Sequence, residues 1–292
     1  SDIKPTLAKE KFIEAHNGVV ILSNSENIHY PFTAADANDS PWQDRFQTRD
    51  DYAASDTMLA HMIITQDADK VITSHDPRLA KFMNPVETAG GGAGSSASVK
   101  VVYSTLGGVT YGGMPYGVLT PGILQAWVSY MPDTIIKTSN AKVGGMLYSY
   151  AQIALSYSEA AFRGWIPASA GTAQQWYELG IKASMSQWGV SSADADTYVA
   201  GVAAASIETI ATEKWKALYM QGIESWSEWR RLDFPNLAPA TDILTGTGIP
   251  VRNGYGSTTA SANKVNHDAA VKLMGKNPGD NLQDVKVWWD AN

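Results

Sequence analysis

The chain has 292 residues, of which 44% are hydrophobic and 17% are charged, and its net charge is −7 at neutral pH. A chain of this size can bury a sizeable core, and its hydrophobic fraction argues against disorder. Because phosphate binding requires a basic surface, the acidic balance argues against nucleic acid as a partner. The absence of cysteine excludes disulfides, thiolate metal sites and cysteine nucleophiles. No apolar run reaches the roughly 18 residues that a membrane-spanning helix requires.

The first part of the chain alternates helix signals with polar, loop-like sequence. Residues 6–16 predict a helix, because an Asn-Gly pair, a common C-terminal stop, follows them. Residues 23–50 are polar and predict a loop that carries Trp42 in its middle. Ser55 has the side chain of an N-cap and predicts a helix that continues to Thr65.

Residues 87–132 differ in composition from the rest of the chain. They begin with a tract rich in Gly and Ser, after which Tyr alternates with Gly and Pro. Such a composition excludes a long helix and predicts an ordered loop that presents Tyr103, Tyr111 and Tyr116. Trp127 belongs to the same loop region.

Helical patterns dominate from residue 142 onward. A stripe of small and apolar residues predicts a first helix that ends at Gly164. Thr172 and Gln175 form a capping box that opens a second helix, and Ser191 caps a third. A long helix is predicted over residues 206–231. The first two helices resemble one helix-turn-helix unit of a tetratricopeptide array, although no second copy follows at a fixed period.

Aromatic residues mark the C-terminal part of the chain. Within residues 213–235, Trp215, Tyr219 and Trp226 fall at helical spacing on one apolar face, opposite a charged face. This pattern predicts that these rings pack in the core. Residues 236–292 predict a loop-rich tail with one short helix.

The sequence lacks the motifs of the common hydrolases, nucleotide-binding sites and zinc proteases. Its five histidines are scattered, and no two of them have the spacing of metal ligands. Asp36 opens a segment with the rhythm of a calcium loop, but Pro41 and Gln47 occupy the positions that require Gly and Glu. We therefore predict no catalytic residue, no metal and no cofactor. A pair of carboxylates for glycoside hydrolysis stays open, because such a pair is formed in space rather than in sequence.

Several segments, in a fixed order and spread over nearly the whole chain, resemble one protein family. They are similar to the SusD/RagB-like outer-membrane nutrient-binding lipoproteins of Bacteroidetes, in the branch called SusD-like type 2. The segments are NSENIHYPF at 24–32, DPRLAKF at 76–82, YGGMPYG at 111–117, ALSYSEAAFRGWI at 154–166, WYELGIKASMSQWGV at 176–190, EKWKALYMQGIESWSEWRRLDFP at 213–235 and GDNLQDVKVWWD at 279–290.

This resemblance implies a mainly α fold, in which a tetratricopeptide-like helical scaffold carries long ordered loops. It implies a single SusD-like domain over residues 1–292, with a loop region at 87–132, the scaffold at 142–231 and a loop-rich tail at 236–292. Family members are considerably longer and begin with a signal and a lipidated cysteine. The chain is therefore expected to be the C-terminal portion of such a protein, incomplete at the N-terminus, with any lipid anchor outside it.

The resemblance also implies a binding protein rather than an enzyme. Such proteins lie on the extracellular face of the outer membrane, capture oligosaccharides or related nutrients, and pass them to a SusC-like TonB-dependent transporter. Two other functions stay open. One is a glycan-active hydrolase, and the other is a structural docking scaffold for the transporter.

Aromatic residues on loops are the expected ligand contacts. Loops on a rigid scaffold carry binding, and the C–H face of a sugar stacks on an aromatic ring while polar side chains bond its hydroxyls. The candidates are Trp42, Tyr103, Tyr111, Tyr116 and Trp127.

Overall fold

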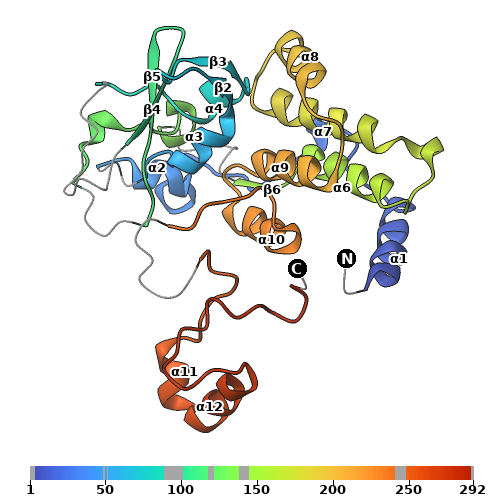
Figure 1. Cartoon of the computed structure of the whole chain (residues 1–292), viewed down its shortest axis with the longest axis vertical. Coiled ribbons are helices and arrows are strands. Elements are labelled where there is room, and N and C mark those ends of the chain that lie inside the picture. Colours follow the sequence, from blue (N-terminus) through green and yellow to red (C-terminus); the bar gives the residue numbers. More distant parts are fainter. Residues whose placement is uncertain are drawn as a thin grey trace.

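Helices make up most of the regular structure in the computed structural model, which describes residues 4–48, 50, 52–88, 101–117, 122–137, 145–240 and 248–290. The strands in these residues are short and form three separate two-stranded sheets. The predicted mainly α architecture is therefore confirmed. Figure 1 shows a mixed lobe and a group of packed helices side by side, with the last two helices standing apart from both.

The mixed lobe, which we call the hairpin lobe, comprises the described residues between 40 and 137. Its helices are α2 (Pro41–Arg45), α3 (Asp56–Met62), α4 (Leu79–Phe82) and α5 (Asp133–Ile136), and its strands are β2 (Ile63–Gln66), β3 (Ile72–His75), β4 (Val102–Leu106) and β5 (Val109–Gly113). Ser55 caps α3 by accepting a hydrogen bond from the N–H of Met58 (3.0 Å), as predicted, but the helix ends at Met62 and the chain continues as β2.

The predicted loop at 87–132 contains a β-hairpin instead, in its described part. Strands β4 and β5 pair antiparallel, with Tyr103 opposite Gly112, and two glycines with positive φ, Gly107 and Gly108, make the turn. A Cβ atom on Gly113 would lie 2.4 Å from the Cα of Asp56 in α3. The glycines that suggested a loop are thus needed because β5 packs directly against other backbone.

The helical scaffold comprises α6 (Tyr150–Phe162), α7 (Ala173–Gln187), α8 (Ser192–Gly201), α9 (Ile207–Ala217) and α10 (Gly222–Leu232). Helices α6 and α7 pack closely because Gly180 has no side chain: a Cβ there would lie 2.5 Å from Leu155. The capping box of α7 is confirmed, since the N–H of Thr172 donates to Gln175 Oε1 (2.8 Å) and the N–H of Gln175 donates to Thr172 Oγ1 (3.2 Å).

The single helix predicted over 206–231 is wrong. The chain breaks between α9 and α10 at Met220, whose φ of 72° lies in the left-handed region. Tyr219 beside it is tied to the hairpin lobe, because its hydroxyl donates to the carbonyl of Phe82 (2.8 Å). Trp226 therefore turns away from the face that carries Trp215 and Tyr219, which a continuous helix would have shared.

A buried ionic cluster joins the hairpin lobe to the scaffold. Arg78 and Asp76 of the lobe are both 0% exposed. Arg78 pairs with Asp76 (2.6 Å) and with Glu213 of α9 (2.5 Å). Lys216 of α9 bridges Asp76 (3.2 Å) and Glu213 (3.0 Å), and Tyr198 of α8 donates its hydroxyl to Glu213 (2.7 Å). Because the charges are paired and hydrogen-bonded, burial is tolerated here and fixes how the two bodies meet.

The remaining segments lie on the edges of this pair of bodies. Helix α1 (Pro5–His16) has the predicted bounds within one residue and places Phe12 against Tyr157 of α6 at 5.1 Å between ring centroids. Strand β1 (Ile28–His29) pairs with β6 (Met146–Tyr148) just before α6. Short 3₁₀ turns lie at Asn24–Glu26, Asp36–Asn38, Gln125–Trp127 and Ala168–Ala170.

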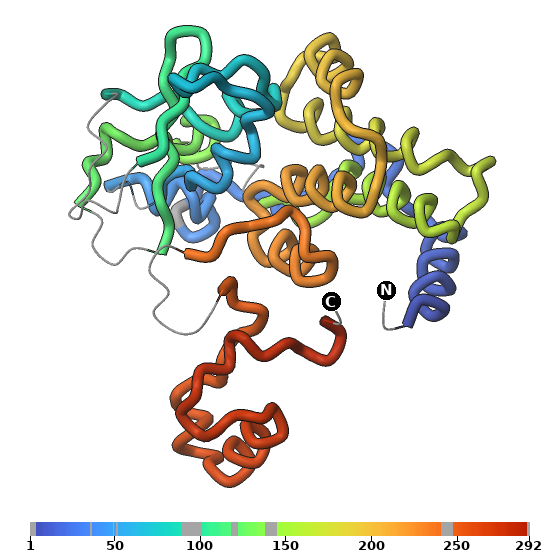
Figure 2. The backbone as a smooth tube through the Cα atoms, viewed as in Figure 1, coloured from blue at the N-terminus to red at the C-terminus, as the bar shows by residue number. Residues whose placement is uncertain are grey.

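The tail contains two helices, α11 (Ser257–Ala262) and α12 (Lys264–Leu273), rather than the one predicted. Figure 2 shows the chain running out to these helices and returning toward α10. The return is anchored by Arg230, whose guanidinium lies 3.8 Å from the ring of Trp226 and 4.7 Å from that of Trp289. Among the residues with assigned positions, no helix combines the length and apolarity that crossing a bilayer requires.

Candidate functional site

An aromatic pocket lies where the hairpin lobe meets the helical scaffold. We call it the junction pocket. It has a volume of about 350 Å³, within the range of known ligand sites. Its principal lining residues are Trp42, Tyr52, Met58 and Met131 from the hairpin lobe, and Trp215 and Met220 from the scaffold. Residues that are far apart in the sequence thus come together because the ionic cluster holds the two bodies in contact.

The lobe side of the junction pocket presents Trp42 and Tyr52. Pro41 begins α2 and fixes the backbone one residue before Trp42. The rings of Trp42 and Tyr52 meet edge to face at 5.8 Å, an arrangement that holds both in place. Tyr52 stays 48% exposed, so it can contact a ligand from solution.

The scaffold side presents Trp215, which sequence reasoning assigned to the core. Its ring lies 5.1 Å from that of His61, whose Nδ1 is hydrogen-bonded to the carbonyl of Thr57 (2.8 Å). Burial, and secondarily the charge of Lys216, lowers the pKa of His61, so this neighbour of Trp215 is neutral at pH 7. Met220, at the helix break that the periodicity does not reveal, also lines the pocket.

The indole N–H groups of Trp42 and Trp215 differ from those of three other tryptophans. Trp176, Trp226 and Trp229 each donate to a backbone carbonyl of the protein itself. Within the described residues, neither Trp42 nor Trp215 has such a bond. Each can therefore donate to a ligand while its ring supplies an apolar face.

The described lining of the pocket carries no charge. Among the residues with described positions, no Asp, Glu, Lys or Arg lines it, and its side-chain hydroxyls come from Ser55, Tyr52, Tyr219 and Ser225. Ser55 is committed to the α3 cap and Tyr219 to Phe82. Such a lining can hold a flat, neutral molecule by stacking and a few hydrogen bonds. These described residues do not include the paired carboxylates of a glycosidase. In the part of the chain with described coordinates, no cluster of His, Asp and Glu has the arrangement of a metal site either.

The other predicted ligand residues lie elsewhere. Tyr116 is 38% exposed and donates its hydroxyl to the carbonyl of Ala238. Burial and the nearby charge of Asp56 raise its pKa. Tyr103 and Trp127 pack around Gly112, where an added Cβ would lie 3.0 Å from the Tyr103 ring and 2.5 Å from the Trp127 carbonyl.

Tyr111 corrects the expectation of a loop residue that faces a ligand. It lies on β5, is 3% exposed and belongs to the core of the hairpin lobe. Burial also raises the pKa of its hydroxyl. Its ring has almost no surface to offer a ligand, because alternation along the strand turns it inward.

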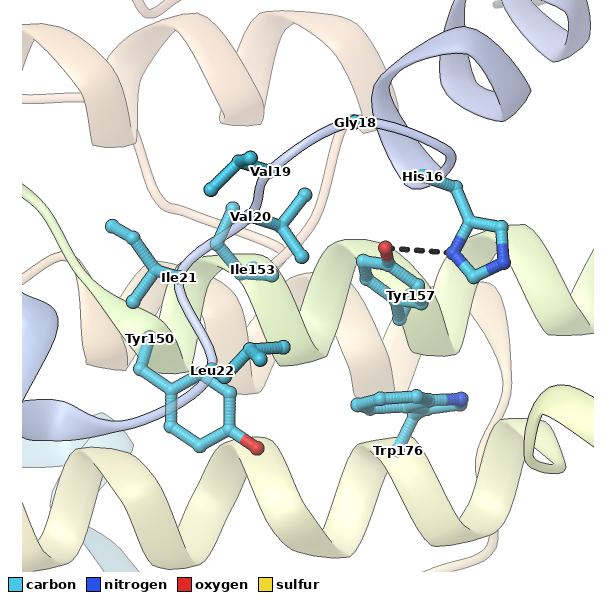
Figure 3. A pocket seen from close by; sticks show the side chains of 10 residues that line it. All are labelled: His16, Gly18, Val19, Val20, Ile21, Leu22, Tyr150, Ile153, Tyr157 and Trp176. Atoms are coloured by element: carbon cyan, nitrogen blue, oxygen red, sulfur yellow. Dashed lines mark hydrogen bonds between the residues drawn. The ribbon is translucent and has the colours of Figure 1, made fainter.

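A second aromatic pocket, of about 420 Å³, lies wholly on the helical side. We call it the scaffold pocket. Figure 3 shows Tyr150, Tyr157 and Trp176, which project from α6 and α7 beneath the extended segment 18–22. Two of its polar groups are engaged: Tyr157 OH is hydrogen-bonded to His16 Nδ1 (2.9 Å), and Trp176 donates to the carbonyl of Ala170 (2.9 Å). Aliphatic side chains form the rest, so sugar hydroxyls would find few partners there.

Comparison with known families decides the identity of the fold. Residues 1–256 match the SusD-like type 2 family, described as starch-binding and associating with the outer membrane. The chain belongs to this family. No curated protein matches it.

Solved structures of SusD-like proteins share the fold of this family member. A protein described as chitin-binding is 25% identical, with a TM-score of 0.75, and the match covers 100% of this chain and 61% of that one. A chitin-binding SusD homologue from Flavobacterium johnsoniae is 23% identical, with a TM-score of 0.71 and coverages of 100% and 60%. A SusD homologue from Bacteroides uniformis is 21% identical, with a TM-score of 0.70 and coverages of 100% and 61%. The chain thus spans about 61% of the length of the first of these relatives.

Proposed function

We propose that this protein is a cell-surface glycan-binding protein that captures neutral oligosaccharides at the junction pocket. One observation carries the proposal: Trp42, Tyr52 and Trp215 converge on a pocket whose described lining is uncharged, and both indole N–H groups are available to a ligand. The SusD-like family supports the same function. Two of its structural relatives are described as chitin-binding, so chitin fragments belong among the first ligands to test.

The expected affinity is modest. An aromatic ring that stacks on a sugar contributes about 0.5–1.5 kcal/mol beyond area burial, by analogy with aromatic pairs. Two tryptophans and one tyrosine therefore hold a short oligosaccharide without binding it irreversibly. Modest affinity suits a protein that releases its cargo.

We propose further that the cargo passes to a SusC-like TonB-dependent transporter at the extracellular face of the outer membrane. Family membership is the support for this step. Attachment to the membrane by a lipid anchor outside this chain is part of the same proposal, and family membership supports it as well.

The junction pocket supports a binding protein without catalysis rather than a glycan-active hydrolase. Hydrolysis of a glycoside requires two carboxyl groups about 5–10 Å apart across the scissile bond. The described lining residues of the junction pocket include no acid that could serve as either one. The structural docking scaffold is the remaining alternative, and it predicts no ligand at all.

Isothermal titration calorimetry with short neutral oligosaccharides of starch, cellulose, mannan and chitin tests the proposal. Trp42→Ala and Trp215→Ala should each lower affinity for the bound glycan about tenfold, as expected for a lost stacking ring. Trp288→Ala is the matched control, because Trp288 is 79% exposed on the tail. Binding that survives the double substitution would place the site elsewhere, and the absence of any glycan binding would favour the docking scaffold.

A further inference from the structure

Three of the residues that line the junction pocket are methionines, which we call its methionine floor. Met58 comes from α3, Met131 from the segment before α5, and Met220 from the break between α9 and α10. Met131 is 5% exposed and belongs to the lobe core, whereas Met58 and Met220 are partly buried against that core. Three thioether side chains from separate segments thus form an apolar, adaptable surface beside the aromatic rings.

Such a floor fits some sugars better than others. A hexose ring presents hydroxyl groups around its rim, and a hydroxyl pressed against methionine loses water without gaining a partner. An acetamido substituent presents a methyl group instead, which gains from apolar contact. Its amide carbonyl can accept a hydrogen bond from Trp42 or Trp215, whose indole N–H groups are unused within the described residues.

The charge of a sugar also affects how well it fits the junction pocket. A free amino sugar carries a cation and a uronic acid an anion, and either would lose water without gaining a counter-charge from the described lining residues of the pocket. His61, the ionisable ring in contact with Trp215, has a pKa lowered by burial and supplies no positive charge at pH 7. Neutral sugars meet no such penalty from these residues.

We propose that the junction pocket selects N-acetylated sugars, with the acetamido methyl group seated on Met58, Met131 and Met220. This inference rests on the proposed function, because it names the class of glycan that the same pocket takes. The tryptophan rings provide the stacking common to all neutral glycans, and the methionine floor provides the discrimination.

Calorimetry with three tetrasaccharides of equal length tests the inference on the 292-residue chain. The probes are the β-1,4-linked tetramers of N-acetylglucosamine, glucose and glucosamine. The N-acetylated tetramer should bind about tenfold more tightly than the glucose tetramer, the scale of one well-placed apolar group, and the glucosamine tetramer should bind weakest at pH 6. Equal affinity for the N-acetylated and glucose tetramers, or tighter binding of glucosamine, would overturn the inference.

Substitution of the floor separates selectivity from stacking. Met58→Gln keeps the length of the side chain but adds an amide, so it should reduce the preference for the N-acetylated tetramer severalfold and leave the glucose tetramer nearly unaffected. Met220→Gln serves as a second variant if the first fails to fold, and Met274→Gln in the tail is the control. An unchanged preference in a folded floor variant contradicts the methionine role, whereas the loss of all glycan binding in the wild type contradicts the proposed function itself.

Discussion

The two aromatic pockets are similar in size and in ring content, yet they differ in what their polar atoms do. In the scaffold pocket, His16 bonds Tyr157 and Ala170 accepts from Trp176, so the rings complete the packing of α1, α6 and α7. In the junction pocket, the indole N–H groups of Trp42 and Trp215 are unused within the described residues. Clustered rings alone therefore do not identify a ligand site. The two indole N–H groups that stay available at the junction pocket make it the better candidate.

The pockets also differ in what holds their walls together. The rings of the scaffold pocket stand on neighbouring helices of one body, α6 and α7. The walls of the junction pocket belong to two bodies, and the buried cluster of Asp76, Arg78 and Glu213 lies between the same two bodies. Three perturbations distinguish the pockets on these grounds.

The largest effect is expected from Arg78→Met. It leaves two buried carboxylates without their main cation, and breaking a buried pair in this way costs about 3–5 kcal/mol. Urea unfolding should show this loss, and glycan affinity should fall with it, because the walls of the junction pocket lose their connection. Lys137→Met is the control, since its pair with Asp133 is exposed and worth about 0–1 kcal/mol. A loss below about 1 kcal/mol for Arg78→Met would show that the cluster does not hold the junction.

Trp176→Ala should have an intermediate effect, on stability alone. Trp176 is partly buried and packs on Tyr157 at 4.7 Å, so its loss should cost about 2 kcal/mol, less than the ~3–5 kcal/mol of a fully buried tryptophan. The affinity for glycan should equal that of the wild type, in contrast to Trp215→Ala. Thermal unfolding and calorimetry on the same samples measure both quantities. A drop in affinity comparable to that of Trp215→Ala would make the scaffold pocket part of the site.

The smallest effect is expected from pH and salt on glycan affinity. Burial lowers the pKa of His61 below its usual 6.5, so this histidine is neutral in the folded protein between pH 8 and about 7. No charged side chain lines the junction pocket among the residues that the structure describes. Affinity should therefore stay constant over that pH range and on raising salt from about 0.05 to about 0.5 M. A change of more than about twofold would reveal a charged group at the ligand.

Local signals in the sequence predict local structure well here. Ser55, Thr172 and Gln175 act at helix starts as predicted, because a capping side chain bonds backbone within three residues of itself. The sequence does not predict the hairpin at Val102–Gly113 or the helix break at Met220, because both depend on residues that are distant in the sequence. Close packing of β5 on α3 requires the glycines that otherwise signal a loop. The break accompanies a bond from Tyr219 to Phe82, a residue far away in the sequence.

The sequence alone determined the family, the helical scaffold and the presence of rings suited to sugars, since motifs and periodicity are properties of neighbouring residues. Only the tertiary structure decided which rings face a pocket. It moved Tyr111 into the core and brought Trp215 to the junction beside Trp42. The physical reason is that a pocket between two bodies depends on how those bodies meet. Here they are joined by buried charges at Asp76, Arg78 and Glu213, whose pairing no local pattern encodes.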